Sequence, residues 1–280
     1  MAPEQPKESW IHRARKIPHV KGGNISVLGS HIVAASSEFL GTFFFLWLGY
    51  GGQLMALTQA ATPAGRSGGA SSQTVVFISL IYSFSLLVNA WAFYRISGGL
   101  FNPAVSLGLS LSGQLSWVRT AFFIPVQLLA SMCAGGLAAA MFSGDISQVN
   151  TLLSAETSIA KGLFIEMFMT AELVFVILML AAEKSKDTYL APIGIGLALF
   201  ICELAGVFYT GGSLNPARSF GCAVAGRSFP GYHWIYWLGP VLGAALAALY
   251  YRFVKWAHYE EVNPGQDSAG AEEDANNEAV

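Results

Sequence analysis

The stretch of sequence that decides the fold occurs twice. It reads SGGLFNPAVSLG at positions 97–108 and TGGSLNPARSFG at positions 210–221. Seven of the twelve positions are identical, including both Asn-Pro-Ala triplets: Asn102, Pro103 and Ala104, then Asn215, Pro216 and Ala217. Asn is a strong N-cap and Pro suits the first helical position, so each triplet predicts the start of a helix.

Both predicted helices are short, covering about Pro103–Leu111 and Pro216–Ala225. Ten helical residues rise about 15 Å, which is half of a hydrocarbon core about 30 Å thick. Neither helix can span a bilayer alone. Two such helices that enter from opposite faces and meet at their N-termini would span it together.

Bulk composition places the rest of the chain in lipid. Of 280 residues, 54% are hydrophobic and only 11% are charged, against about 25% charged in a soluble domain. Six apolar stretches have the roughly 20 residues that a transmembrane helix needs: Ile32–Leu54, Thr74–Tyr94, Leu115–Phe142, Leu163–Ala182, Leu190–Tyr209 and Tyr232–Val254. The predicted fold class is an all-α membrane protein with six transmembrane helices and two re-entrant half-helices.

The two Asn-Pro-Ala windows are predicted to lie on opposite sides of the membrane, because three spans separate them. Such an inverted repeat places its site near the midplane. The partial positive ends of two helix dipoles would then meet there, beside the amide donors of Asn102 and Asn215. Polar backbone at that depth must line water or buried protein, so a narrow water-filled path that repels cations is expected.

Charge placement predicts the orientation. With both termini inside, eleven Lys and Arg residues are cytoplasmic and four are external (Arg66, Lys161, Arg218 and Arg227). We expect a cytoplasmic segment at 1–31, a channel domain at 32–256 and an acidic disordered tail at 257–280. The repeats are predicted to cover about 32–142 and 161–256. The expected location is the plasma membrane.

Several function classes have little support in the sequence. A net charge of −2 argues against a nucleic-acid partner. Cys133, Cys202 and Cys222 have no His partner at metal-ligand spacing, and no Ser-His-Asp grouping is evident, so we expect neither a metal, a cofactor nor an enzyme. A secondary transporter with discontinuous helices is an alternative, but no Asp within the predicted spans could build a cation relay.

The paired motifs resemble those of the aquaporins, or major intrinsic proteins, over residues 32–256, and the overall pattern is similar to fungal members. The second box continues to Arg218, as in that family. The resemblance implies a homotetramer in which each subunit has its own pore. It also implies that Glu38 and Glu166, each in a Glu-x-x-x-Thr sequence, hold the backbone of the re-entrant loops.

The resemblance also locates a selectivity filter of four residues, Tyr82, Glu203, Gly212 and Arg218. Water channels of the family usually have Phe at the first position and His at the second, so Glu203 is the larger departure. Two interpretations of Glu203 stay open. It either lines the filter and makes permeability depend on pH, or turns away to bond with backbone carbonyls or water.

Four further positions bear on the solute. Glycerol channels of the family typically have Asp after the second motif and Pro-Leu in the last span. This chain has Ser219 and Ala223, then Tyr236 and Trp237, which are the types found in water channels. The expected solute is water, with protons and ions excluded. Hydrogen peroxide is a second expected solute, and a glycerol or small-neutral-solute channel is the alternative.

Overall fold

The computed structural model describes residues 25–60, 71–183 and 188–262. The predicted cytoplasmic segment at 1–31 and the predicted acidic tail at 257–280 lie largely outside these residues. Within the described ranges the regular structure is helical, without strands. Six helices are long and apolar enough to cross a membrane, so the predicted class of an all-α, six-span membrane protein is confirmed.

The elements of the first repeat are α2 (Val27–Ala60), α3 (Ser72–Phe93), α4 (Pro103–Ser112) and α5 (Trp117–Met141). A short 3-10 helix, η1 (Ile146–Val149), follows α5. The second repeat contains α6 (Ile159–Ile177), α7 (Ala191–Thr210), α8 (Pro216–Ala225) and α9 (Ile235–Trp256). α6 continues into a π-helical turn, η2 (Leu178–Ala182), and 3-10 helices η3 (Thr188–Leu190) and η4 (Tyr259–Glu261) flank α7 and α9.

The predicted spans occur, but the first is longer than its apolar run of Ile32–Leu54 suggested. α2 begins at Val27, where the Ser26 hydroxyl accepts a hydrogen bond from the Gly29 backbone N–H at 3.0 Å. This start therefore lies at a local capping interaction rather than at the edge of the hydrophobic stretch. α2 also includes the last residues of the segment predicted as N-terminal extension.

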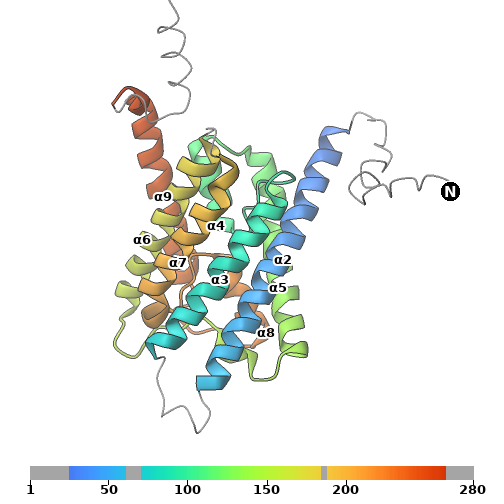
Figure 1. Ribbon diagram of the computed structural model, residues 1–280, viewed down its shortest axis with the longest axis vertical. Helices are drawn as coiled ribbons and strands as arrows, with labels where there is room; N and C mark the ends of the chain where they lie inside the picture. Colours follow the sequence, from blue (N-terminus) through green and yellow to red (C-terminus); the bar gives the residue numbers. More distant parts are fainter. Residues whose placement is uncertain (1–24, 61–70, 184–187, 263–280) are drawn as a thin grey trace, which may run out of the picture.

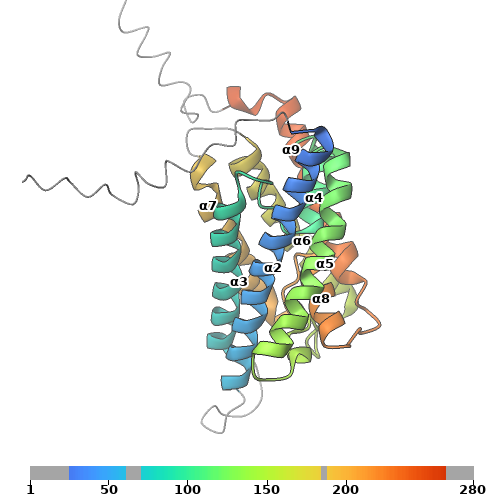
Figure 2. The same cartoon turned by 90° about the vertical axis from the view of Figure 1, so that its right-hand side faces the viewer.

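Contacts between helices repeat when the two halves are exchanged. α2 packs on α3 and α5, and their counterparts α6, α7 and α9 pack in the same way. Each half-helix packs against the last span of the other repeat, α4 on α9 and α8 on α5. The long helices run side by side, with α4 towards the upper end and α8 towards the lower end (Figures 1 and 2).

Glycines allow the closest of these approaches. A Cβ atom at Gly243 would lie 2.2 Å from the Met167 carbonyl oxygen of α6, and one at Gly221 would lie 2.4 Å from the Ser131 carbonyl oxygen of α5. Contact at this distance is possible only without a side chain, as in other membrane helix pairs with small interfacial residues. Large apolar side chains such as Phe84, Phe168 and Leu249 instead point outward, as expected for a surface that faces lipid.

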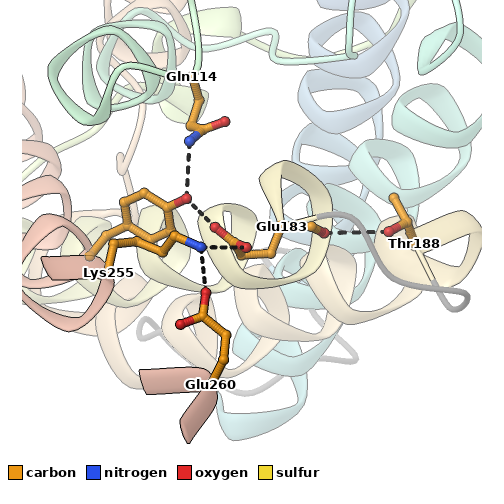
Figure 3. Close-up of polar contacts among 6 residues, drawn as sticks. Gln114, Glu183, Thr188, Lys255 and Glu260 are labelled. Carbon is orange, nitrogen blue, oxygen red and sulfur yellow. Dashed lines mark hydrogen bonds and ion pairs between the residues drawn. The ribbon is translucent and has the colours of Figure 1, made fainter. Parts of the chain in front are cut away.

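A polar cluster of Gln114, Glu183, Tyr251, Lys255 and Glu260 lies at the end of the bundle where α6 and α9 end. Lys255 pairs with Glu183 at 3.3 Å and with Glu260 at 2.6 Å. The Tyr251 hydroxyl donates to Glu183 and accepts from the Gln114 amide at 3.0 Å (Figure 3). Because Gln114 follows α4, these contacts tie the outer end of that half-helix to α6 and α9.

Candidate functional site

The two Asn-Pro-Ala boxes meet in the middle of the bundle. Each Asn caps its own half-helix, since Asn102 Oδ1 accepts from the Ala104 N–H at 2.8 Å and Asn215 Oδ1 accepts from the Ala217 N–H at 2.9 Å. Both half-helices therefore begin as the sequence predicted, with Pro in the first turn. The side-chain oxygens are occupied by capping, which leaves the amide N–H groups for other partners.

Each Asn amide also bonds across to the opposite box. Asn102 Nδ2 donates to the Leu214 carbonyl at 2.9 Å, and Asn215 Nδ2 donates to the Phe101 carbonyl at 2.9 Å. An amide nitrogen has two N–H donors. The second donor of each Asn has no protein partner in the described part of the chain, and both residues line the same cavity. A solute oxygen can therefore accept from both.

Phe101 and Leu214 make these cross-links possible through an unusual backbone conformation. Their φ values are 53° and 50°, in the left-handed region that non-glycine residues rarely adopt. This conformation costs about 1–2 kcal/mol per residue and turns the carbonyl towards the other repeat. Sequence analysis did not single out either residue. Their position directly before each Asn was visible, but an apolar side chain gives no signal of a positive φ.

Two buried carboxylates hold these strained residues. Glu38 accepts from the backbone N–H groups of Leu100 at 3.0 Å and Phe101 at 2.8 Å. It also accepts from Ser97 Oγ at 2.6 Å and from Gln127 Nε2 at 2.9 Å.

Glu166 makes the equivalent contacts in the second repeat. It accepts from the backbone N–H groups of Ser213 at 3.0 Å and Leu214 at 2.8 Å, and from Thr210 Oγ1 at 2.6 Å. A buried carboxylate is costly unless donors surround it, and both Glu residues have such a set. These contacts are of the kind that the resemblance implied for this pair.

A cavity of about 290 Å³ connects the box junction with the end of the bundle near the polar cluster. Its wall includes Gln114, Leu115 and Arg119 at that end, Asn102 and Asn215 at the junction, and Tyr82, Glu203 and Arg218 beyond. Glu203 is twelve residues into α7, about 18 Å along the helix from its start. Three of the four predicted filter residues, Tyr82, Glu203 and Arg218, therefore line the same cavity.

Gly212 does not line this cavity, but it makes room for Glu203. A Cβ atom at Gly212 would lie 2.1 Å from Glu203 Oε2, and the residue has a φ of 60°. The Glu203 carboxylate thus occupies the space that a side chain at position 212 would fill. Its Oε2 is buried and has no hydrogen-bond partner among the residues that the structure describes.

Arg218 does not form an ion pair with Glu203. Within the described ranges, acidic and basic side chains lie within 4.0 Å of each other only at Lys255. The guanidinium instead donates to the Val149 carbonyl at 2.9 Å, the Gln53 side-chain oxygen at 2.8 Å and the Gly211 carbonyl at 3.3 Å. Its buried Nε has no hydrogen-bond partner within the described ranges. The site thus contains a buried carboxylate oxygen and a buried N–H donor that no described residue pairs with.

The four positions expected to indicate the solute lie outside the cavity wall. Ser219 bonds with Ser213 Oγ at 2.6 Å, and the Tyr236 hydroxyl donates to the Thr210 carbonyl at 2.8 Å. Trp237 packs edge-to-face on Phe220 at 5.7 Å. Tyr236 and Trp237 therefore do not line this cavity.

The fold and this site define a membrane channel made of two inverted halves. The model of the major intrinsic protein family matches residues 28–251, and the chain belongs to that family. It is 64% identical over 245 residues to "Probable aquaporin-3" of Gibberella zeae, covering 88% of this chain and 85% of that protein. It is 52% identical over 243 residues to "Aquaporin-7" of Botryotinia fuckeliana, covering 85% of this chain but only 53% of that relative.

A solved structure shares the fold. The aquaglyceroporin from Plasmodium falciparum superimposes with a TM-score of 0.66 at 20% sequence identity, covering 80% of this chain and 95% of that one. The predicted family, the aquaporin-like fold and the multi-pass membrane character are thereby confirmed. Members of the family are channels that act on small solutes within a bilayer.

Proposed function

We propose that this channel passes water and excludes protons and ions. The observation that carries the proposal is that Asn102 and Asn215 line the same cavity, each with one amide N–H that has no protein partner among the described residues. Two adjacent donors beside the N-termini of two half-helices bind an oxygen and repel cations. In aquaporin-type channels generally, the positive ends of half-helices or an Arg exclude protons and cations.

The proposed filter consists of Tyr82, Glu203, Gly212 and Arg218. Arg218 supplies a fixed positive charge, and the Tyr82 ring lies beneath its guanidinium with 4.8 Å between the guanidinium carbon and the ring centroid. The Glu203 carboxylate adds an acceptor that water, hydrogen peroxide or a hydroxylated solute can use. Because aromatic bulk limits the diameter at Tyr82, water is the favoured solute and hydrogen peroxide a second one. Glycerol is the alternative.

Stopped-flow light scattering on proteoliposomes tests the solute. Vesicles with the protein should shrink faster in a sucrose gradient than protein-free vesicles. In a glycerol gradient they should re-swell no faster than protein-free vesicles. Rapid glycerol re-swelling would favour the alternative, and equal shrinkage in sucrose would refute a water channel.

Glu203 is proposed to make water permeability depend on pH, because this residue lines the cavity and its side chain is a titratable carboxyl group. Permeability of the wild type, Glu203→Gln and Glu203→His should be compared between pH 5 and 8. We expect the profile of Glu203→Gln to be flat, because its amide does not titrate in this range. Identical profiles in all three proteins would overturn the proposed role.

The remaining expectations complete the proposal. The two repeats, 32–142 and 161–256, form one channel domain in the plasma membrane, with both termini cytoplasmic, and four subunits assemble with one pore each. Glu38 and Glu166 serve as structural carboxylates. Light scattering of the purified protein with detergent subtracted measures the subunit number, and a mass other than four chains would refute the tetramer.

A further inference from the structure

A buried glutamine in the first span contacts two residues of the filter through one atom. Gln53 Oε1 accepts a hydrogen bond from the Tyr82 hydroxyl at 2.8 Å and from Arg218 Nη2 at 2.8 Å. We propose that Gln53 is a positioning residue that fixes both walls of the filter and thereby sets its discrimination between water and larger polar solutes. This inference rests on the proposed function.

The contact with Arg218 joins the two repeats. Gln53 belongs to α2, whereas Arg218 belongs to α8 of the second half. The other oxygens near the guanidinium are the backbone carbonyls of Val149 and Gly211. Gln53 therefore supplies the side-chain oxygen in this set, at the shortest of the three distances. A hydrogen bond from a charged donor is stronger than a neutral one, so its loss should shift the orientation of the guanidinium.

The contact with Tyr82 determines which part of that side chain the solute meets. The Tyr82 side chain is buried, and its hydroxyl donates to Gln53, so the ring face lies under the Arg218 guanidinium. Gly49 provides the space, because a Cβ atom there would lie 2.4 Å from the Tyr82 ring. Tyr82 thus presents an aromatic ring to the path, while its hydroxyl proton is held by Gln53.

Chemistry explains why an amide oxygen suits this position. It has two lone pairs and can accept from the phenol and the guanidinium at once. Without it, two buried donors would lack an acceptor, which is costly in a dry environment. Glu203 lines the same cavity, and its Oε2 has no hydrogen-bond partner among the described residues. Release of Arg218 from Gln53 should therefore alter the width and charge of the path.

The test is the ratio of glycerol to water permeability in proteoliposomes, with the protein-free value subtracted from each permeability. Only this subtracted ratio is independent of how many channels are folded. Where the wild type passes no measurable glycerol, the detection limit sets its reference ratio. A residue with only a structural role would lower both permeabilities in proportion. For Gln53→Leu we expect the ratio to rise about three- to tenfold, since one hydrogen bond to a charged group and one to a phenol are lost. Gln53→Glu keeps an acceptor for both donors and should restore the wild-type ratio.

Two further variants complete the design. Gln53→Asn withdraws the amide oxygen from both donors while remaining polar, and should raise the ratio as Gln53→Leu does. If Gln53→Leu does not fold, this variant provides the test. Gln148→Leu makes the same substitution at an exposed glutamine of η1 and should match the wild type.

The outcomes separate the two proposals. A wild-type ratio in both Gln53→Leu and Gln53→Asn, or a raised ratio in Gln53→Glu equal to that of Gln53→Leu, would overturn the positioning role. Wild-type vesicles that shrink no faster than protein-free vesicles would refute the proposed water channel instead.

Discussion

Replacement of Glu38 by Gln should destabilise the re-entrant loop of the first repeat. One oxygen of Glu38 accepts from Ser97 and Leu100, and the other accepts from Phe101 and Gln127. An amide keeps one of these oxygens and replaces the other with an N–H donor. Whichever way the amide turns, two donors lose their acceptor.

The magnitude follows from these two losses. A buried donor left without a partner costs about 1–3 kcal/mol, so two of them cost about 2–6 kcal/mol of the free energy of unfolding. Hydrogen bonds between membrane helices average closer to 0.6 kcal/mol, roughly, because the unfolded state in the membrane also finds partners. We therefore expect the lower end of the range, about 2 kcal/mol.

Equilibrium unfolding of the purified protein in mixed micelles with increasing SDS measures this change. The matched control is Glu156→Gln, which makes the same substitution at an exposed carboxylate outside the membrane spans, between η1 and α6, with no hydrogen bond in the described structure. It should stay within about 0.5 kcal/mol of the wild type. If Glu38→Gln were as stable as this control, the idea that Glu38 holds the left-handed turn at Phe101 would be refuted.

Three other substitutions test further parts of the structure. Gly212→Ala should abolish most water permeability, because its Cβ would lie 2.1 Å from Glu203 Oε2. Gly113 also has a left-handed backbone but open space around it, so Gly113→Ala tests the backbone strain alone. An equal loss of permeability in Gly113→Ala would contradict the proposed clash. Gly243→Ala should lower the free energy of unfolding by about 1–3 kcal/mol, because its Cβ would overpack against α6. Gly136→Ala is the control and should have no such effect, because nothing lies within 4 Å of its Cβ. Equal SDS midpoints of unfolding for the two variants would disprove the close approach. Glu260→Gln should remove a stabilising contribution at neutral pH. The hydrogen bond from Lys255 lowers the pKa of Glu260, so this contribution is present above the ordinary Glu pKa of about 4.3 and is lost as pH falls through the lowered value. A wild-type minus variant stability difference that stays constant from pH 7 to pH 3 would contradict it.

The architecture could be predicted from the sequence because its signals are local. Apolar runs long enough to span lipid gave the six helices, and two Asn-Pro-Ala windows gave the starts of both half-helices. The inverted arrangement followed from counting three spans between the windows. The ends of the spans were less accurate, as at Val27, because a single capping hydroxyl sets them rather than hydropathy.

The inner geometry could not be predicted in the same way. Glu203, Tyr82 and Arg218 were expected to share a filter, but the distance between Glu203 and Arg218 depends on where α7 and α8 lie in the bundle and on the space at Gly212. The sequence did not single out Gln53, although a polar residue inside an apolar span itself indicates a buried contact or a functional site. Its importance depends on two partners that are 29 and 165 positions away in the chain.

The sequence by itself determined that this chain is a two-fold repeated membrane channel, because burial in lipid and helix capping act over a few residues at a time. Only the tertiary structure decided which donors and acceptors face the solute path. The physical reason is that hydrogen bonds such as those from Asn102 to Leu214 and from Arg218 to Gln53 join different repeats, so their geometry exists only after both halves have packed together.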